Sequence, residues 1–209
     1  MLLNILGRWL IYITGIMVMS YGVCLCIGAG LGVLPWDVFH IGLSNHTFLT
    51  TGNAIQITGG ILVAISSLIT KSWPKVGTIL NMILVGIFVD MFFKLNFLPS
   101  PSGLVFQFSM LLFGIFLFSF GGGMYLSSNL GAGPRDSLNL ALAEKTRGSI
   151  RLIKTVLEVS ALVFGYCLGG PVGIGTVITS LTVGYIFQSS IVFWRHKVSI
   201  WLPREQTVL

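Results

Sequence analysis

Residues 15–43 read GIMVMSYGVCLCIGAGLGVLPWDVFHIGL, and residues 114–142 read GIFLFSFGGGMYLSSNLGAGPRDSLNLAL. The two stretches lie 99 positions apart and agree at 9 of 29 positions, which include a leucine-glycine pair, a proline and an aspartate. Further along the chain, VGTILNMILVG at 76–86 is similar to IGTVITSLTVG at 174–184. Self-similarity at a nearly fixed spacing indicates an internal duplication, with one copy over 1–99 and the second over 100–209.

The composition is that of a membrane protein. Of the 209 residues, 54% are hydrophobic and 9% are charged, and the mean hydropathy is +0.92. A soluble domain has roughly 25% charged residues. Six apolar runs each have close to the ~20 residues that cross a bilayer, namely 9–31, 52–70, 76–95, 104–127, 150–168 and 172–194. We therefore predict an all-α membrane fold with six transmembrane helices.

The odd number of spans in each copy predicts how the two copies are oriented. Three spans per copy bring the second copy into the membrane from the opposite side, so the fold is expected to contain two inverted three-helix repeats. After the first span of each copy, a glycine-rich break and a proline precede an apolar segment that is too short to cross. We expect a short helix at each of these places. Broken helices at matching positions of inverted repeats are typical of secondary transporters.

The basic residues predict the topology. Of the 12 Lys and Arg residues, 11 fall on the side of the amino terminus, Arg204 among them, and Lys94 alone falls on the other side. By the positive-inside rule both termini are expected to be cytoplasmic. The net charge of +6 is then explained by topology and by contact with anionic lipid. No platform of interleaved aromatic and basic residues accompanies it, so nucleic-acid binding is not expected.

Asp37 and Asp136 follow the two prolines and allow two interpretations. Proline suits the first turn of a helix, and an aspartate two residues later lies near the positive end of the helix dipole, so both acids could simply begin short helices. Alternatively, the two elements dip inward from opposite sides and meet near the middle of the membrane, where the acids line a transport site. The two interpretations are compatible.

Arg135 precedes Asp136 at the position where the first copy has Trp36. A guanidinium could bind a carboxylate or a phosphate, and Trp36 could stack on a solute. The alternatives are an arginine that only sets topology and a tryptophan that only anchors the helix at the membrane interface.

Glu158 is the most unusual acid, because it lies in a predicted span at ~12 Å from the cytoplasmic end of its helix. Arg151, Lys154 and Glu158 fall on one helix face. An ionisable residue at membrane depth is a candidate functional residue. It could instead form a structural ion pair with Lys154 or Arg135, and the sequence leaves both options open.

The run GGPVGIGT at 169–176 enters the last span. Backbone amides at the start of that helix, around Gly175 and Thr176, could hold an anion, although the glycines also suit close helix packing. No phosphate-loop pattern follows, and Cys and His are not clustered, so no cofactor and no metal site are expected.

The runs GAGPRDSL, LGGPVGIGT and LGVLPWDVFHIGLS resemble the bacterial YczE/YitT-like family of multipass membrane proteins, over about 9–195. The resemblance implies a bacterial cytoplasmic membrane and no particular substrate. Carried over by position, the recurrent polar motif of that family falls on Pro35, Asp37, Pro134, Arg135, Asp136, Glu158, Gly175 and Thr176.

These observations favour a secondary transporter of a small solute, for which an anion is one option, working by alternating access of the two repeats. The expected substrate-binding residues are Trp36, Asp37, Arg135, Asp136, Glu158, Gly175 and Thr176. An accessory protein that docks a partner or lipid through the basic cytoplasmic loop 128–149 is the alternative. No nucleophile with a matching base is evident, so enzyme activity is not expected. A homodimer is compatible with the glycine-rich helix faces.

Overall fold

The computed structural model describes residues 2–202, and these form eight helices and no strands. The helices are α1 (Leu2–Gly28), α2 (Pro35–Asn45), α3 (Thr51–Thr70), α4 (Val76–Lys94), α5 (Leu104–Ser127), α6 (Pro134–Thr146), α7 (Ile150–Cys167) and α8 (Ile174–Trp201). Arg204, which contributed to the predicted topology, lies outside the described residues. The eight helices of the described chain confirm the predicted all-α class of the fold.

Five of the eight helices are long and apolar enough to cross a membrane: α1 from Asn4, α3, α4, α5 and α8. The sixth predicted span corresponds to α7, which has 18 residues and includes Arg151, Lys154 and Glu158. Because of these three charged residues, α7 is not among the helices that are apolar enough to count as candidate spans. The described chain thus has five candidate spans where the hydropathy pattern predicted six.

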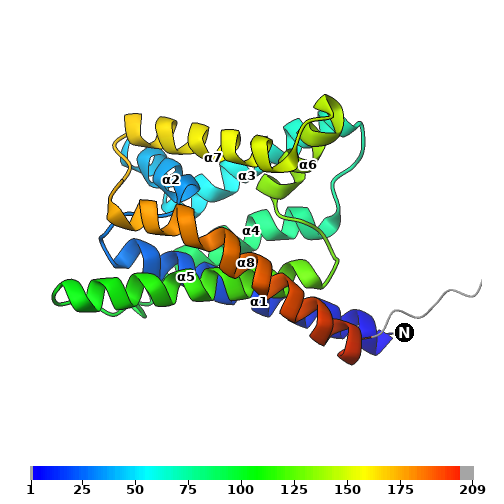
Figure 1. Cartoon of the computed structure of the whole chain (residues 1–209), viewed down its shortest axis with the longest axis horizontal. Coiled ribbons are helices and arrows are strands. Elements are labelled where there is room, and N and C mark those ends of the chain that lie inside the picture. Colours follow the sequence, from blue (N-terminus) through cyan, green and yellow to red (C-terminus); the bar gives the residue numbers. More distant parts are fainter. Residues whose placement is uncertain (1, 203–209) are drawn as a thin grey trace, which may run out of the picture.

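The helices form two layers (Figure 1). One layer contains α1, α4, α5 and α8, in which α5 packs against both α1 and α8, and α1 also packs against α4. The other contains α2, α3, α6 and α7, in which α2 packs on α7 and α3 packs on α6. The layers are joined mainly by the contact of α3 with α4 and also by a smaller contact of α4 with α6, whereas α7 and α8 make no extensive contact with each other in the described chain.

Glycines bring α1 and α5 into close contact at the centre of the first layer. A Cβ added at Gly15 would lie 2.9 Å from the Gly121 carbonyl oxygen, and one added at Gly22 would lie 2.7 Å from the Gly114 carbonyl oxygen. Gly15 comes before Gly22 on α1, whereas its neighbour Gly121 comes after Gly114 on α5. The two helices are therefore antiparallel. Small residues at such crossings let backbones approach closely in membranes, where packing drives helix association.

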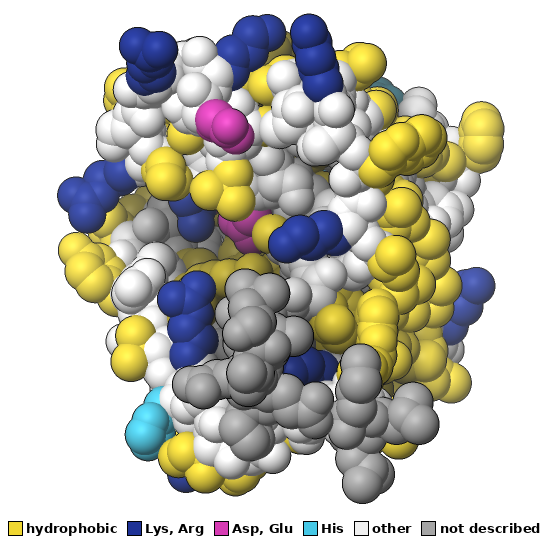
Figure 2. Space-filling view, turned by 90° about the vertical axis from the view of Figure 1, so that its right-hand side faces the viewer, with side chains coloured by type: hydrophobic (Ala, Val, Ile, Leu, Met, Phe, Trp, Pro, Cys, Tyr) yellow, Lys and Arg dark blue, Asp and Glu magenta, His cyan; other side chains and the backbone are white. Residues whose placement is uncertain are grey.

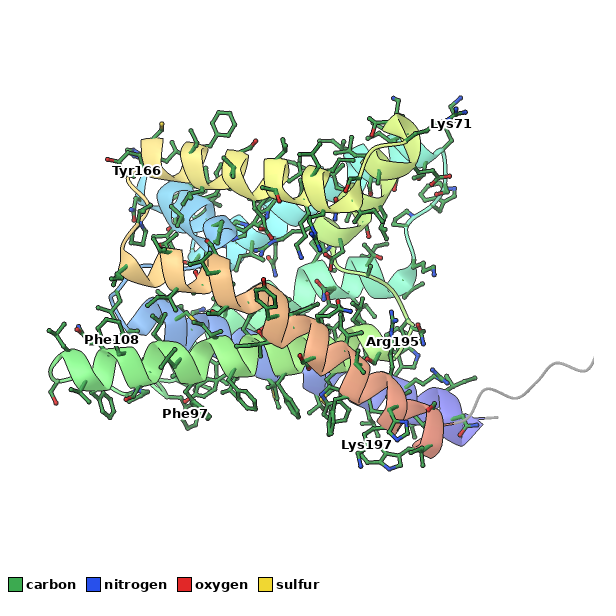
Figure 3. The ribbon with its side chains drawn as sticks, in the orientation of Figure 1. Lys71, Phe97, Phe108, Tyr166, Arg195 and Lys197 are labelled. Carbon is green, nitrogen blue, oxygen red and sulfur yellow. The ribbon has the colours of Figure 1, made fainter. Side chains whose placement is uncertain are left out.

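Apart from Lys94 in the last turn of α4, the long helices carry their basic residues at one end of the molecule. Figure 3 shows Lys71, Arg195 and Lys197 at that end and Phe108 and Tyr166 at the opposite end. The last helix continues past the predicted boundary at 194 to Trp201, because hydropathy marks the hydrocarbon region and not the end of the helix. We call the end with Lys71 and Arg195 the basic end.

Asp90 connects two helices. It accepts hydrogen bonds from the Thr50 hydroxyl at 2.5 Å and from the Gly52 N–H at 2.9 Å. Gly52 and Gly86 are in direct contact beside it. Asp90 therefore fastens the start of α3 to α4 at the end of the molecule opposite the basic end.

Candidate functional site

The two short helices begin as the sequence predicts. Pro35 and Pro134 occupy the first turns of α2 and α6, after extended residues at Leu34 and Gly133, because a proline needs no backbone N–H there. The chain reaches α2 through Gly32, whose φ is 103° and where a Cβ would lie 2.6 Å from the Gly173 nitrogen. Only glycine combines that backbone angle with that approach. The break between α1 and α2 thus depends on this residue.

The starts of α2 and α6 meet inside the protein. The Arg135 guanidinium of α6 lies 3.5 Å from the Asp37 carboxylate of α2, and its carbon centre lies 5.1 Å from the centroid of the Trp36 ring. Asp37 is 1% exposed, whereas the Arg135 side chain is 33% exposed. A buried carboxylate requires a countercharge, and here the second half of the chain supplies the cation for the first.

These residues lie on the wall of a cavity of about 640 Å³. Its wall is formed by parts of every helix: α1, α5 and the starts of α2 and α6 contribute, as do α3, α4, α7 and α8. Five of the seven predicted site residues line it, namely Trp36, Asp37, Arg135, Asp136 and Glu158. The volume falls within the ~300–1,000 Å³ typical of small-molecule sites.

Four residues that line the cavity each have one buried polar atom without a hydrogen-bond partner among residues 2–202: Asp37 Oδ2, His40 Nδ1, Asn81 Nδ2 and Asn139 Oδ1. His40 Nδ1 does lie 3.4 Å from Asp37 Oδ1, but the geometry is not that of a hydrogen bond. Buried polar groups in native proteins are almost always satisfied. Several unsatisfied atoms in one cavity indicate a place where water or a ligand completes the hydrogen bonding.

The two remaining acids face the cavity from the second half of the chain. Asp136 lies close to the Tyr125 hydroxyl and in the electrostatic field of Arg135 and Lys154. Glu158 is half-buried and forms no hydrogen bond or ion pair with any described residue. The structural pairing of Glu158 with Lys154 or Arg135 is therefore not formed, and its carboxylate is available to the cavity.

Gly175 and Thr176 lie away from the cavity. The Gly175 N–H donates to the Leu31 carbonyl oxygen at 2.7 Å, and the Thr176 hydroxyl accepts from the Gly173 N–H at 3.3 Å. These contacts hold the start of α8 against the break before α2, so packing accounts for the glycines of this run. The amides at this helix start do not face the site.

No sequence pattern described above singles out His40, Asn81 or Asn139 as site residues. His40 is 1% exposed and lies in the cavity wall. A signal for two of them was present: His40 follows Asp37 by three residues, which is one helical face, and Asn139 is its counterpart 99 positions later. Within residues 2–202, no three His, Cys, Asp or Glu side chains are grouped so as to hold a metal ion.

Comparison with known proteins identifies the family of this chain. Residues 6–191 match a family described as "Family of unknown function (DUF6198)". The chain is 40% identical to the "Uncharacterized membrane protein YczE" of Bacillus subtilis, over 88% of this chain and 85% of that protein. An "Uncharacterized protein" of Haemophilus influenzae is 33% identical over 82% of this chain and 77% of its own. No solved structure matches. The chain is a membrane protein that belongs to the DUF6198 family, in agreement with its YczE-like motifs.

Proposed function

We propose that this protein is a secondary transporter of a small solute, and that the cavity between its two helix layers is the transport site. The observation that carries the proposal is the group of unpartnered polar atoms on Asp37, His40, Asn81 and Asn139 in the cavity wall. A scaffold protein has no need for unsatisfied buried groups, each of which costs roughly 1–3 kcal/mol. A solute-binding site keeps such groups, because the bound solute supplies their hydrogen-bond partners.

We further propose that the two copies are inverted repeats. Gly15 and Gly114 are counterparts at a spacing of 99, as are Gly22 and Gly121. Gly15 contacts Gly121, and Gly22 contacts Gly114. Exchanging each glycine for its counterpart turns the first contact into the second. Reciprocal contacts of this kind are expected of two similar units related by a twofold axis. The antiparallel course of α1 and α5 fits an axis in the membrane plane.

We propose that α7 is the sixth span. Its 18 residues extend over ~27 Å, and it presents large apolar side chains at Val156, Val159, Val163 and Phe164 on the outer surface. Its charged residues Lys154 and Glu158 face the cavity instead. A span whose ionisable residues line a wet cavity needs no further hydrophobicity to reside in the membrane.

The two copies differ in one respect that suits alternating access. In the first copy, Gly52 of α3 contacts Gly86 of α4, and Asp90 fastens the two helices. In the second copy, Gly184 is the counterpart of Gly86, and it has open space where a Cβ would project. Gln188 occupies the position that corresponds to Asp90. We infer that in this state the cavity is closed on the α3–α4 side and open between α7 and α8, which make no extensive contact in the described chain. In the second transport state, α7 and α8 would close on each other and α3 and α4 would separate.

The proposed orientation places the basic end in the cytoplasm of a bacterial cell, with both termini on that side. Lys75, Lys154 and Arg195 of the cavity wall belong to that end of their helices. The cavity would therefore open toward the cytoplasm in this state, and the Asp90 contact would close it toward the outside.

The experiment is flux into proteoliposomes that contain the wild type, Glu158→Gln or Glu144→Gln. Glu144 is an exposed acid of α6 outside the cavity and serves as the matched control. Small anions, amino acids and cations are screened with and without a proton gradient. We expect a solute flux that Glu158→Gln reduces by at least tenfold and that Glu144→Gln leaves unchanged. Correctly folded wild type without flux of any solute would favour the accessory function of loop 128–149.

A further inference from the structure

The charges of the cavity wall are arranged in two zones. Lys75, Lys154 and Arg195 lie toward the basic end, where α4 begins, α7 begins and α8 approaches its end. Asp37, Asp136 and Glu158 lie deeper, with Arg135 as the neighbouring cation. Figure 2 views the molecule from the basic end and shows Lys and Arg side chains around a hollow in which an acidic side chain is visible.

Pairing within the wall leaves a surplus in each zone. Arg135 is engaged by Asp37 and by the Trp36 ring, which leaves the carboxylates of Asp136 and Glu158 in the deep zone. In the outer zone the Lys154 ammonium lies 6.0 Å above the Phe187 ring, and no carboxylate within ion-pair distance neutralises it in the described chain. The deep zone therefore has more carboxylates than cations and the outer zone more cations than carboxylates, although Lys154 also attracts Asp136 across the boundary. About 6 Å of helix rise separates Lys154 from Glu158.

The unpartnered atoms add hydrogen-bonding requirements to the deep zone. Asp37 Oδ2 is buried and accepts no hydrogen bond, and an ionised carboxylate can only accept. Asn139 Oδ1 is a second open acceptor, whereas the open atom of Asn81 is the donor Nδ2, so two of these three atoms need a donor from the ligand. An ammonium group, which has three donors and no acceptor, satisfies an acceptor-rich and negative surface better than a carboxylate or a phosphate does.

We propose that the cavity binds a small zwitterion, with its ammonium group in the deep zone near Asp37, Asp136 and Glu158 and its carboxylate near Lys154 and Arg195. This inference rests on the proposed transport function for its biological meaning, but the binding site itself is independent of it. A simple anion would leave the acceptors of the deep zone unsatisfied. A simple cation would leave the outer lysines without a partner.

The test is binding of three matched probes to the purified full-length protein in detergent, measured by calorimetric titration. The probes share a four-carbon chain: 4-aminobutanoate is the zwitterion, butane-1,4-diamine has two ammonium groups, and butanedioate has two carboxylates. We expect the zwitterion to bind at least tenfold more tightly than either of the others. Equal or tighter binding of the dianion or of the diamine, or no binding of any probe, would overturn the proposal.

Two variants locate the ammonium group. Glu158→Gln keeps the size of the side chain and removes its charge, so the affinity for 4-aminobutanoate should fall about tenfold while that for butanedioate stays the same or rises. Glu144→Gln should change neither affinity. Zwitterion binding without flux in proteoliposomes would preserve this site and refute transport, whereas flux of a different solute class would preserve transport and refute the zwitterion.

Discussion

The ion pair between Asp37 and Arg135 connects the two halves of the chain, so its energy can be measured as a coupling between the two residues. At a separation of 3.5 Å and an effective dielectric constant of about 20, Coulomb attraction amounts to ~5 kcal/mol. Water in the cavity screens part of this, because a third of the Arg135 side chain is exposed. We therefore expect a coupling free energy of about 2 kcal/mol.

The assay is a double-mutant cycle with Asp37→Asn, Arg135→Gln and the double variant, each unfolded reversibly in mixed micelles and followed by circular dichroism. Each single variant should destabilise the protein, and the second substitution should cost less once the first is present. Glu144→Gln combined with Arg135→Gln is the control, since Glu144 lies ~13 Å along the helix from Arg135. A coupling of Asp37 with Arg135 below ~0.5 kcal/mol would refute the conclusion that this pair holds α2 and α6 together.

Three further predictions follow from the packing and the charges. Gly121→Ala should lower the free energy of unfolding by ~1–3 kcal/mol, because its Cβ would lie 2.4 Å from the Met19 nitrogen. Gly184→Ala should not destabilise the protein, because there is open space around Gly184. Equal effects of the two substitutions in unfolding titrations would contradict the described packing. Gly184→Leu should leave the fold intact but reduce flux at least tenfold by preventing α7 from closing on α8, and undiminished flux would refute this closure. Cysteines at Lys71 and Phe97 should react with an impermeant thiol reagent from opposite faces of oriented vesicles, Lys71→Cys from the cytoplasmic face; the reverse result would overturn the proposed orientation.

The sequence predicted the helices well where a local rule applied. The proline at the start of each short helix, the glycine break before it and the apolar length of α3, α4 and α5 all follow from backbone and bilayer dimensions. The extension of α8 to Trp201 could not be read from hydropathy, since Arg195 and Lys197 are good helix formers that belong outside the hydrocarbon.

The site was less predictable, because its chemistry depends on contacts between distant segments. Asp37 and Arg135 are 98 positions apart, and no rule of spacing says which cation neutralises a buried acid. No rule of spacing says either that Glu158 forms no ion pair with Lys154 or Arg135 among the described residues. His40 and Asn139 could have been found by applying the 99-residue register to polar residues on the face of Asp37 and Asp136.

Gly175 and Thr176 show a second way in which a site depends on contacts between distant segments. Exposed amides at a helix start do form anion sites, but here the Gly175 N–H is occupied by the Leu31 carbonyl oxygen. A sequence pattern does not distinguish a free amide from one that another segment satisfies. The glycines serve the contact between the start of α8 and the break before α2.

Alternating access is tested most directly by the reactivity of a cysteine at Ser180, a residue of the cavity wall, in a background where exposed Cys167 is replaced by Ser. An impermeant thiol reagent is applied to either face of oriented vesicles, with Asp90→Ala as a variant in which α3 is no longer fastened to α4. We predict modification from both faces, with Asp90→Ala increasing the rate from the face opposite the basic end. Modification from one face only, in both proteins, would contradict the transporter mechanism.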